Sequence, residues 1–366
     1  MNKLNLVIAD IDKDCAQSLT EYCVDFEKDF FYKVSGFYDE KNLIEYLSLE
    51  SPDVLLIDYN LYSKIQELPF KGVLILMNDG FTPKEYESFE QINKFIQGRE
   101  ITNAVISIYS KVKKSNITFQ KGSKSCRIVA VYSPIGGCGK SSVAVALAKT
   151  MAQAGKKALY INMEDIPSVN LHFPRGNATT DFTEVLYEAI QQKPDIASAI
   201  LASQNIDDTG CGYIRPPESA SYLYDLNREQ WVGLWSSMKA FGMHDDIVID
   251  MSTALDMKNQ VILSLVDDCV VVSDMTKLGN SKLNVFEKNL NTIKDTLKPE
   301  LFKSKVIYLI NETRNKNDAI KNNKDTFMGM QPMVHIPFDK YLATQGSVNL
   351  TYKFGEVIKK VVSIIK

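Results

Sequence analysis

The stretch RIVAVYSPIGGCGKSSVAVALAKTMAQAG, residues 127–155, decides the fold of the larger part of this chain. An apolar run at 128–132 leads into a glycine-rich turn, and an alanine-rich amphipathic segment follows. This order predicts a buried strand, a tight loop and a helix. Gly136, Gly137 and Gly139 let the backbone curl so that its N–H groups surround a phosphate, and the helix N-terminus adds positive potential.

The same loop carries side chains suited to a nucleotide. Lys140 is placed to reach the β- and γ-phosphates, and the hydroxyl of Ser141 is placed to ligand Mg²⁺. The segment Gly136–Ser142 is therefore predicted to bind ATP with Mg²⁺, although Pro134 stands where the general P-loop pattern has glycine. Cys138 is either a small filler of the turn or a reactive thiol.

Further strands of a parallel sheet are predicted within four segments that each contain an apolar run, at residues 157–165, 244–253, 268–275 and 305–312. In such sheets the working groups lie beyond the C-terminal strand ends. Asp250 follows Lys140 by about 110 residues and is predicted to hold Mg²⁺ through water. Glu164 is either a catalytic group that orients or deprotonates water, or a polar residue without a catalytic role.

The first 110 residues repeat this pattern on a smaller scale. Helical patterns separate three apolar runs, at residues 4–9, 53–57 and 73–77. The alternation predicts a flavodoxin-like parallel sheet that is covered on both faces. Asp10 and Asp58 directly follow the first two runs. Both are therefore predicted to lie at the C-terminal edge of the sheet.

This part of the chain resembles the receiver domain of two-component response regulators. Asp58 matches the phosphoacceptor, Asp10 matches one member of the metal-binding acidic pair, and Lys94 matches the family lysine. The pair is broken because no acid directly follows Asp10, and Met77 or Asn78 replaces the expected hydroxyl residue. Phosphoryl transfer needs Mg²⁺ and donors for the oxygens. We therefore expect a docking or dimerisation domain, with phosphorylation of Asp58 as the alternative.

Composition and charge indicate two globular bodies. Of 366 residues, 45% are hydrophobic and 24% are charged, and the net charge is −3. These values exclude disordered and fibrous proteins and argue against a dedicated nucleic-acid coat, so no specific nucleic acid is expected as a partner. Residues 111–125 hold five lysines and no acid. We predict a receiver-like domain at 1–112, a linker at 113–125 and an ATPase domain at 126–366. The linker is either a flexible tether or a surface for anionic lipid or acidic partners.

The GG-x-GK-[ST] form of the loop resembles the deviant Walker A motif of the MinD/ParA family of dimerising ATPases. The resemblance extends from residue 127 to about residue 340. It implies an α/β P-loop NTPase fold and an ATP-dependent homodimer. It also implies that the amide of Asn311 reads the adenine edge and that Pro337 and Phe338 lie close to the base.

Three positions depart from that family pattern. Ile135 replaces the signature lysine that crosses to the partner subunit, and Ile cannot neutralise phosphate charge. Asn162 and Glu164 replace the two acids of a D-x-D pair. The extra methylene of Glu164 displaces its carboxylate by about 1.5 Å, and a misplacement of about 1 Å can cost ~100-fold in rate. Hydrolysis is therefore predicted to be weak or slow, with Lys140, Glu164 and Asp250 as its catalytic candidates.

The C-terminal residues 354–366 have apolar side chains at helical spacing. The predicted helix either covers the sheet of its own domain or binds a membrane surface, as MinD does. The six cysteines include no CxxC pair, and neither a signal peptide nor a membrane span is evident. We therefore expect a cytoplasmic protein, with peripheral membrane or cell-pole association left open.

A receiver-like domain followed by a MinD/ParA-type ATPase is similar to the arrangement of the TadZ/CpaE-like proteins. That resemblance implies a localisation or assembly factor for a Tad/Flp pilus secretion machine, with components of that machine as partners. The alternatives are a partition or division-site ATPase and a signalling ATPase that the receiver regulates. These functions rest on family analogy rather than on a site that recognises pili.

Overall fold

A computed structural model describes residues 3–28, 30–65, 70–113, 126–173, 176, 178, 180–191, 196–274, 276–290, 302, 304–311, 333–337, 348, 350 and 353–365. The chain divides into two compact units, residues 1–122 and 123–366. The division falls within the segment 113–125, where the linker is predicted. Every helix in the described ranges is too short or too polar to span a membrane.

The smaller unit holds one parallel sheet with the strand order β2-β1-β3-β4-β5. Its strands are β1 (Leu4–Ala9), β2 (Phe31–Phe37), β3 (Val54–Asp58), β4 (Val73–Asn78) and β5 (Gln91–Asn93). Its helices are α1 (Lys13–Phe26), α2 (Glu40–Leu49), α3 (Tyr59–Tyr62), the 3₁₀ turn η1 (Lys84–Tyr86) and α4 (Gly98–Lys113).

Helices cover both faces of this sheet, as its apolar strands require. Val7 and Ile57 pack in one cluster with Leu43 of α2 and Leu61 of α3. α1 and α4 contact each other and the strands. β1 ends just before Asp10, and β3 ends at Asp58, so both carboxylates lie at the same edge of the sheet.

The larger unit holds an eight-stranded sheet with the order β13-β12-β11-β6-β10-β7-β9-β8, and among these described strands only the β8–β9 pair is antiparallel. Its strands are β6 (Arg127–Tyr132), β7 (Ala158–Asn162), β8 (Gln204–Ile206), β9 (Gly212–Ile214), β10 (Asp246–Asp250), β11 (Asp268–Asp274), β12 (Val306–Asn311) and β13 (Met333–Ile336). Its helices are α5 (Lys140–Gln153), α6 (Val169–His172), α7 (Phe182–Ile190), α8 (Ile196–Ser203), η2 (Ala220–Tyr224), α9 (Arg228–Phe241), α10 (Met257–Leu265), α11 (Lys277–Leu290) and α14 (Lys353–Ile364).

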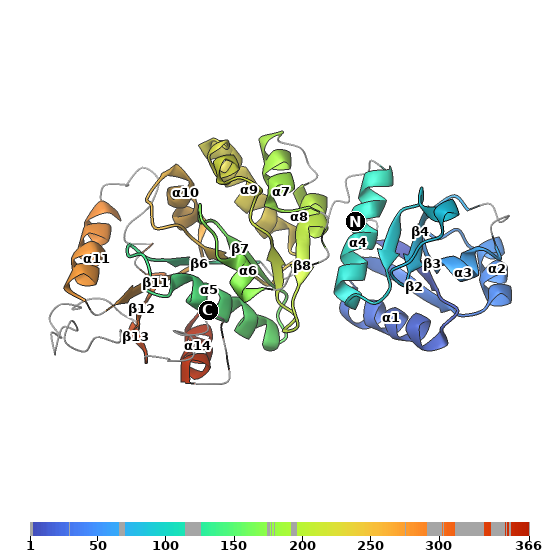
Figure 1. The fold of residues 1–366 in the computed structure, drawn as a ribbon, viewed down its shortest axis with the longest axis horizontal. Coiled ribbons are helices and arrows are strands. Elements are labelled where there is room, and N and C mark those ends of the chain that lie inside the picture. Colours follow the sequence, from blue (N-terminus) through green and yellow to red (C-terminus); the bar gives the residue numbers. More distant parts are fainter. Residues whose placement is uncertain are drawn as a thin grey trace. The chain divides into compact units, whose positions relative to one another are not determined.

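The two faces of the central strand β6 are buried by different helices. Val129 and Val131 pack in one cluster with Leu147 of α5. The next side chain, Tyr132, packs instead on Phe286 of α11, with ring centroids 4.7 Å apart. Successive side chains of a strand point to opposite faces, so this alternation places α5 and α11 on opposite sides. Figure 1 shows α5 beside α14, and α9 beside α10.

The C-terminal helix α14 covers the core rather than presenting a free apolar stripe. Phe354, Ile358 and Val361 are at most 1% exposed and share a cluster with α5 and the sheet. Its exposed positions include Lys359 and Lys360. The geometry therefore favours the first of the two roles predicted for this segment, the packing helix of the domain.

The predicted α/β fold with two parallel sheets is confirmed. β10 (Asp246–Asp250) ends at Asp250, where the sequence predicts the end of this strand. The sequence interpretation did not identify the short strand β9 or the short edge strand β8. Because these strands have only three residues each, they carry too little periodicity to be recognised.

Candidate functional site

The glycine loop between β6 and α5 has the backbone shape of an anion cradle. Gly137 and Gly139 adopt φ values of 72° and 90°, in the left-handed region that favours glycine. A Cβ added to Gly136 or Gly137 would meet nothing within 4 Å, so the loop has open space beside these two glycines. At Gly139 a Cβ would lie 2.8 Å from the Nδ2 of Asn311, so only glycine fits there.

Hydrogen bonds from inside the fold hold this loop in shape. The Oγ of Ser133 accepts from the backbone N–H of Ile135 at 3.0 Å and from the thiol of Cys138 at 3.0 Å. The Nδ2 of Asn311 donates to the carbonyl of Cys138 at 2.8 Å. Burial raises the pKa of the Cys138 thiol. These contacts favour the filler role for Cys138, because reactive cysteines have a lowered pKa and some exposure.

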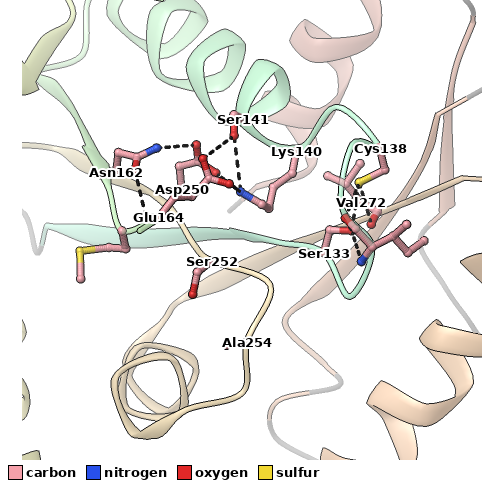
Figure 2. Close-up of polar contacts among 12 residues, drawn as sticks. Ser133, Cys138, Lys140, Ser141, Asn162, Glu164, Asp250, Ser252, Ala254 and Val272 are labelled. Carbon is pink, nitrogen blue, oxygen red and sulfur yellow. Dashed lines mark hydrogen bonds and ion pairs between the residues drawn. The ribbon is translucent and has the colours of Figure 1, made fainter. Parts of the chain in front are cut away.

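Lys140, the first residue of α5, is paired with two carboxylates (Figure 2). Its Nζ lies 2.7 Å from Oδ1 of Asp250 and 2.6 Å from Oε1 of Glu164. The side chain is only 6% exposed. Burial alone lowers the pKa of Lys140, but the two carboxylates outweigh burial and raise it above its ordinary value. The lysine is therefore a buried, charged group between two carboxylates.

Asp250, at the C-terminal end of β10, is the most enclosed acid of the site. Its Oδ2 accepts from the hydroxyl of Tyr160 at 2.9 Å and from Nδ2 of Asn162 at 3.0 Å. The residue is fully buried, and burial raises the pKa of its carboxyl while Lys140 opposes that rise. The partners Tyr160, Asn162 and Lys140 thus fix the orientation of both carboxylate oxygens.

Glu164 lies two residues beyond the end of β7 and reaches back to α5. Its Oε2 accepts from the hydroxyl of Ser141 at 3.2 Å, and its backbone N–H donates to Oδ1 of Asn162 at 2.9 Å. The structure therefore brings the predicted residues Lys140, Ser141, Glu164 and Asp250 together at one sheet edge (Figure 2). Their roles in catalysis and metal binding stay predictions.

The donors of this site fit Mg²⁺ only when phosphate oxygens complete the set. Within the described ranges, no group of three or more His, Cys, Asp or Glu side chains is placed to hold a metal ion. The Ser141 hydroxyl and the Asp250 carboxylate are hard oxygen ligands of the kind that Mg²⁺ prefers, and Mg²⁺ usually adds waters and substrate phosphates to one or two such ligands. The open glycine loop beside them is suited to those phosphates.

Ile135 is directed into the protein. It is 6% exposed and belongs to the apolar cluster that joins α5 to the sheet. A Cβ built on Gly279, in α11, would lie 3.0 Å from its Cδ1, so Ile135 approaches the backbone of α11 closely. The side chain at the position of the signature lysine thus contributes packing and no charge.

The remaining predicted nucleotide contacts are partly placed. Asn311 ends β12, and its side-chain amide donates a hydrogen bond to the glycine loop. Its role as an adenine contact stays a prediction. Pro337 follows β13 and is half-buried. Phe338 lies outside the described residues. Ser142 is half-buried in the first turn of α5.

In the smaller unit, the three residues matched to the receiver site meet at the sheet edge. The Nζ of Lys94 lies 2.9 Å from Oδ2 of Asp58 and 3.3 Å from Oδ2 of Asp10. Both acids are fully buried. Partial burial opposes the charge of Lys94, but Asp58 and Asp10 raise the pKa of its ammonium above the ordinary value.

The other residues near this cluster are engaged in local structure. The carboxylate of Asp12 caps α1 by accepting from the backbone N–H of Asp14 and Cys15, at 2.9 and 3.3 Å. Asn78, at the end of β4, accepts from the N–H of Gly80 at 3.1 Å. Met77 is fully buried. Asp12 is therefore used as a helix cap through Oδ1, and neither Met77 nor Asn78 offers a hydroxyl.

Sequence reasoning missed three groups that shape the larger site. Ser133 supports the loop, Tyr160 orients Asp250, and Lys258 of α10 donates to the carbonyl of Met163 at 2.8 Å. Tyr160 carried a signal, because a tyrosine inside an aliphatic strand needs a partner for its hydroxyl. Lys258 carried none, because a lysine in a polar helical turn is usually exposed.

Comparisons with known proteins concern the larger unit. Residues 126–303 match the family model described as "AAA domain". No curated protein matches the chain.

Solved structures with a similar fold include a ParA family ATPase from Chlorobium tepidum, with 14% identity and a TM-score of 0.54, which covers 66% of this chain and 99% of its own. The septum site-determining protein MinD from Pyrococcus horikoshii, solved with Mg-ADP, has 16% identity, a TM-score of 0.52 and coverages of 66% and 96%. A plasmid partition protein from Borrelia burgdorferi bound to AMPPNP has 20% identity, a TM-score of 0.51 and coverages of 65% and 97%. At such identities the likeness is one of fold. The larger unit has the P-loop NTPase fold of the MinD/ParA type.

The geometry of the smaller unit predicts that Asp58 is not phosphorylated. Incubation with Mg²⁺ and acetyl phosphate is expected to leave the intact mass unchanged. The reasons are that Asp12 caps a helix and that Asn78 stands where a hydroxyl residue is expected. The Asp58→Asn variant supplies the background. Stoichiometric phosphorylation, or chemical-shift changes at Asp58 and Lys94 with beryllofluoride, would contradict the prediction.

Proposed function

We propose that the chain is an ATP- and Mg²⁺-binding protein that dimerises when ATP is bound and hydrolyses it slowly. The observation that carries this proposal is the cluster of Lys140, Ser141, Glu164 and Asp250 beside an open glycine loop. A buried ammonium at the mouth of an N–H-lined loop is suited to phosphate. MinD and the partition protein named above were solved with Mg-ADP and with AMPPNP, which supports the same ligand class here.

The residues of this chain would divide the work as follows. Lys140 would exchange its carboxylate partners for the terminal phosphates, while the loop N–H groups bind the phosphate oxygens. Ser141 and Asp250 would hold Mg²⁺, and Tyr160 and Asn162 would keep the Asp250 carboxylate oriented. Bound Mg²⁺ supplies positive charge that offsets the charge of the phosphates. Glu164 would be released from Lys140 and left to orient water.

We expect slow hydrolysis because this site lacks a cation at position 135 and an acid at position 162. Ile135 is buried in the apolar core, so this position offers no cation to a partner subunit. Asn162 is neutral, and its amide is used to orient Asp250. Of positions 162 and 164, only 164 carries an acid, and without nucleotide Glu164 is in an ion pair with Lys140. A long-lived ATP-bound state is what a positional marker needs.

On this basis we propose a TadZ/CpaE-like role, in which residues 1–112 form a receiver-like docking or dimerisation domain and residues 126–366 form the ATPase domain. The binding partner would be a component of a Tad/Flp pilus machine. The ATP-bound homodimer would mark the position of that machine in the cell. The alternative is a partition or division-site ATPase, which would need faster turnover. The buried Ile135 favours the first proposal.

Nucleotide binding is expected to depend on Lys140. The Lys140→Ala variant should weaken Mg·ATP binding at least about tenfold in a titration, which is about 1.4 kcal/mol or more. Lys149 is a matched control from the same helix, because it also pairs with an acid, Asp207, at 2.9 Å. Lys149→Ala should change the affinity little. An unchanged affinity in Lys140→Ala would remove the glycine loop as the nucleotide site.

Dimerisation is expected to require ATP. Light scattering should report a dimer with Mg·ATP and a smaller species with ADP or without nucleotide, and Lys140→Ala should stay small in all conditions. If ATP strengthens dimerisation by some factor, linkage requires that dimerisation raises the affinity for ATP by the same factor. A monomer throughout would contradict the proposal. A dimer that is indifferent to nucleotide would move the interface to another surface.

Turnover distinguishes the two proposed roles. The parent protein should release phosphate slowly, and the double variant Ile135→Lys/Glu164→Asp should release it about tenfold faster or more, because it restores a cation and a shorter acid. Lys140→Ala sets the background rate. Parent turnover at the speed of cycling partition ATPases would favour the alternative role.

A further inference from the structure

Lys258 is a buried ammonium at an unfavourable place. It lies in the first turn of α10, two residues after the N-cap Asp256, and is 2% exposed. The positive end of the helix dipole opposes a cation there. Burial lowers the pKa of Lys258 as well. A buried charge persists only when specific partners compensate for lost hydration, so those partners indicate what the lysine holds.

The partners of Lys258 come from two other segments. Its Nζ donates to the carbonyl of Met163 at 2.8 Å and lies 3.8 Å from Oδ1 of Asp165. It also lies 5.3 Å from the ring centroid of Tyr224, in η2. The hydroxyl of Tyr224 donates to both oxygens of Asp165, at 2.8 and 2.9 Å. Burial and Asp165 raise the pKa of Tyr224 to about 12, so this hydroxyl stays a donor.

Glu164 lies between the two residues that Lys258 holds. Its carboxylate contacts Lys140 at 2.6 Å and Ser141 at 3.2 Å. The N–H of Met163 donates to the carbonyl of Asp250 at 2.8 Å. The segment 163–165 is thus fastened at both ends, with the Glu164 side chain directed at the glycine loop.

We propose that Lys258 is a positioning residue that fixes the segment 163–165 and thereby sets how firmly Glu164 holds Lys140 and Ser141. The proposal rests on the proposed nucleotide site. The Glu164 carboxylate competes with phosphate for the Lys140 ammonium, because both are anions that need the same donor. When Glu164 is held firmly on Lys140, the affinity for nucleotide is therefore lower. When Glu164 is held less firmly, the affinity is higher.

A double-mutant cycle isolates this effect from the direct loss of a positive charge. The dissociation constant of Mg·ATP is measured for the parent, Lys258→Met, Glu164→Ala and the double variant. In the Glu164→Ala background, Lys258→Met reports only its direct effect. With Glu164 present, the same substitution should shift the dissociation constant toward tighter binding by at least about threefold relative to that background.

A matched control comes from Lys149, which has the same kinds of partners elsewhere in the fold. Its Nζ donates to the carbonyl of His172 at 2.9 Å, pairs with Asp207 at 2.9 Å and lies 4.7 Å from the ring centroid of Phe173. Lys149→Met therefore removes a similar structural cluster. It should show no coupling to Glu164→Ala, although it too lowers stability.

Hydrogen exchange in nucleotide-free protein gives a second, independent readout. Lys258→Met should speed exchange of the backbone amides of Met163 and Glu164, which are bonded to Asp250 and Asn162, and Lys149→Met should not. Equal effects of Lys258→Met in both Glu164 backgrounds, or unchanged exchange at 163–165, would overturn the positioning role. A parent that binds no Mg·ATP would overturn the proposed function instead, and the exchange result would then decide the role of Lys258.

Discussion

The pairing of the buried Lys140 ammonium is the constraint on which the larger unit's site depends. A charge that is 6% exposed needs close partners, and Asp250 and Glu164 provide them at 2.7 and 2.6 Å. Those two acids come from separate strand ends, β10 and the segment after β7, and therefore meet only when the sheet is formed. The ion pairs link the glycine loop to the strand ends on which it folds, so loop, helix and sheet are positioned together.

That arrangement also explains why neutral residues stand among the charged ones. With one ammonium and two carboxylates, the cluster already has an excess negative charge, and the neutral donors Tyr160 and Asn162 satisfy the second oxygen of Asp250 without a further charge. An aspartate at position 162 would face Asp250 as a like charge in a buried setting, which is costly. The neutral Asn162 is therefore compatible with the fully buried Asp250.

The smaller unit uses the same physical scheme in a simpler form. Lys94 bridges Asp10 and Asp58, two fully buried acids at neighbouring strand ends. Asp12, the next acid after Asp10, uses its Oδ1 to cap α1 and satisfies two N–H groups of that helix. The nearest further acid thus serves the start of a helix, which agrees with the prediction that Asp58 is not phosphorylated.

Much of this protein was predictable from its sequence, because strand and helix periodicities and the glycine-loop motif are local patterns. The α/β class and both sheets follow from the order of apolar runs, and so does the placement of Asp250, Asp10 and Asp58 at strand ends. The placement of Lys140 at the start of α5 follows from the glycine-loop motif. Only the tertiary structure decided which side chains meet across long separations. Lys258 contacts Met163, 95 residues earlier, and Tyr160 contacts Asp250, 90 residues later. Such contacts depend on how helices and strands pack, and that information is spread over the whole chain rather than carried by any one segment.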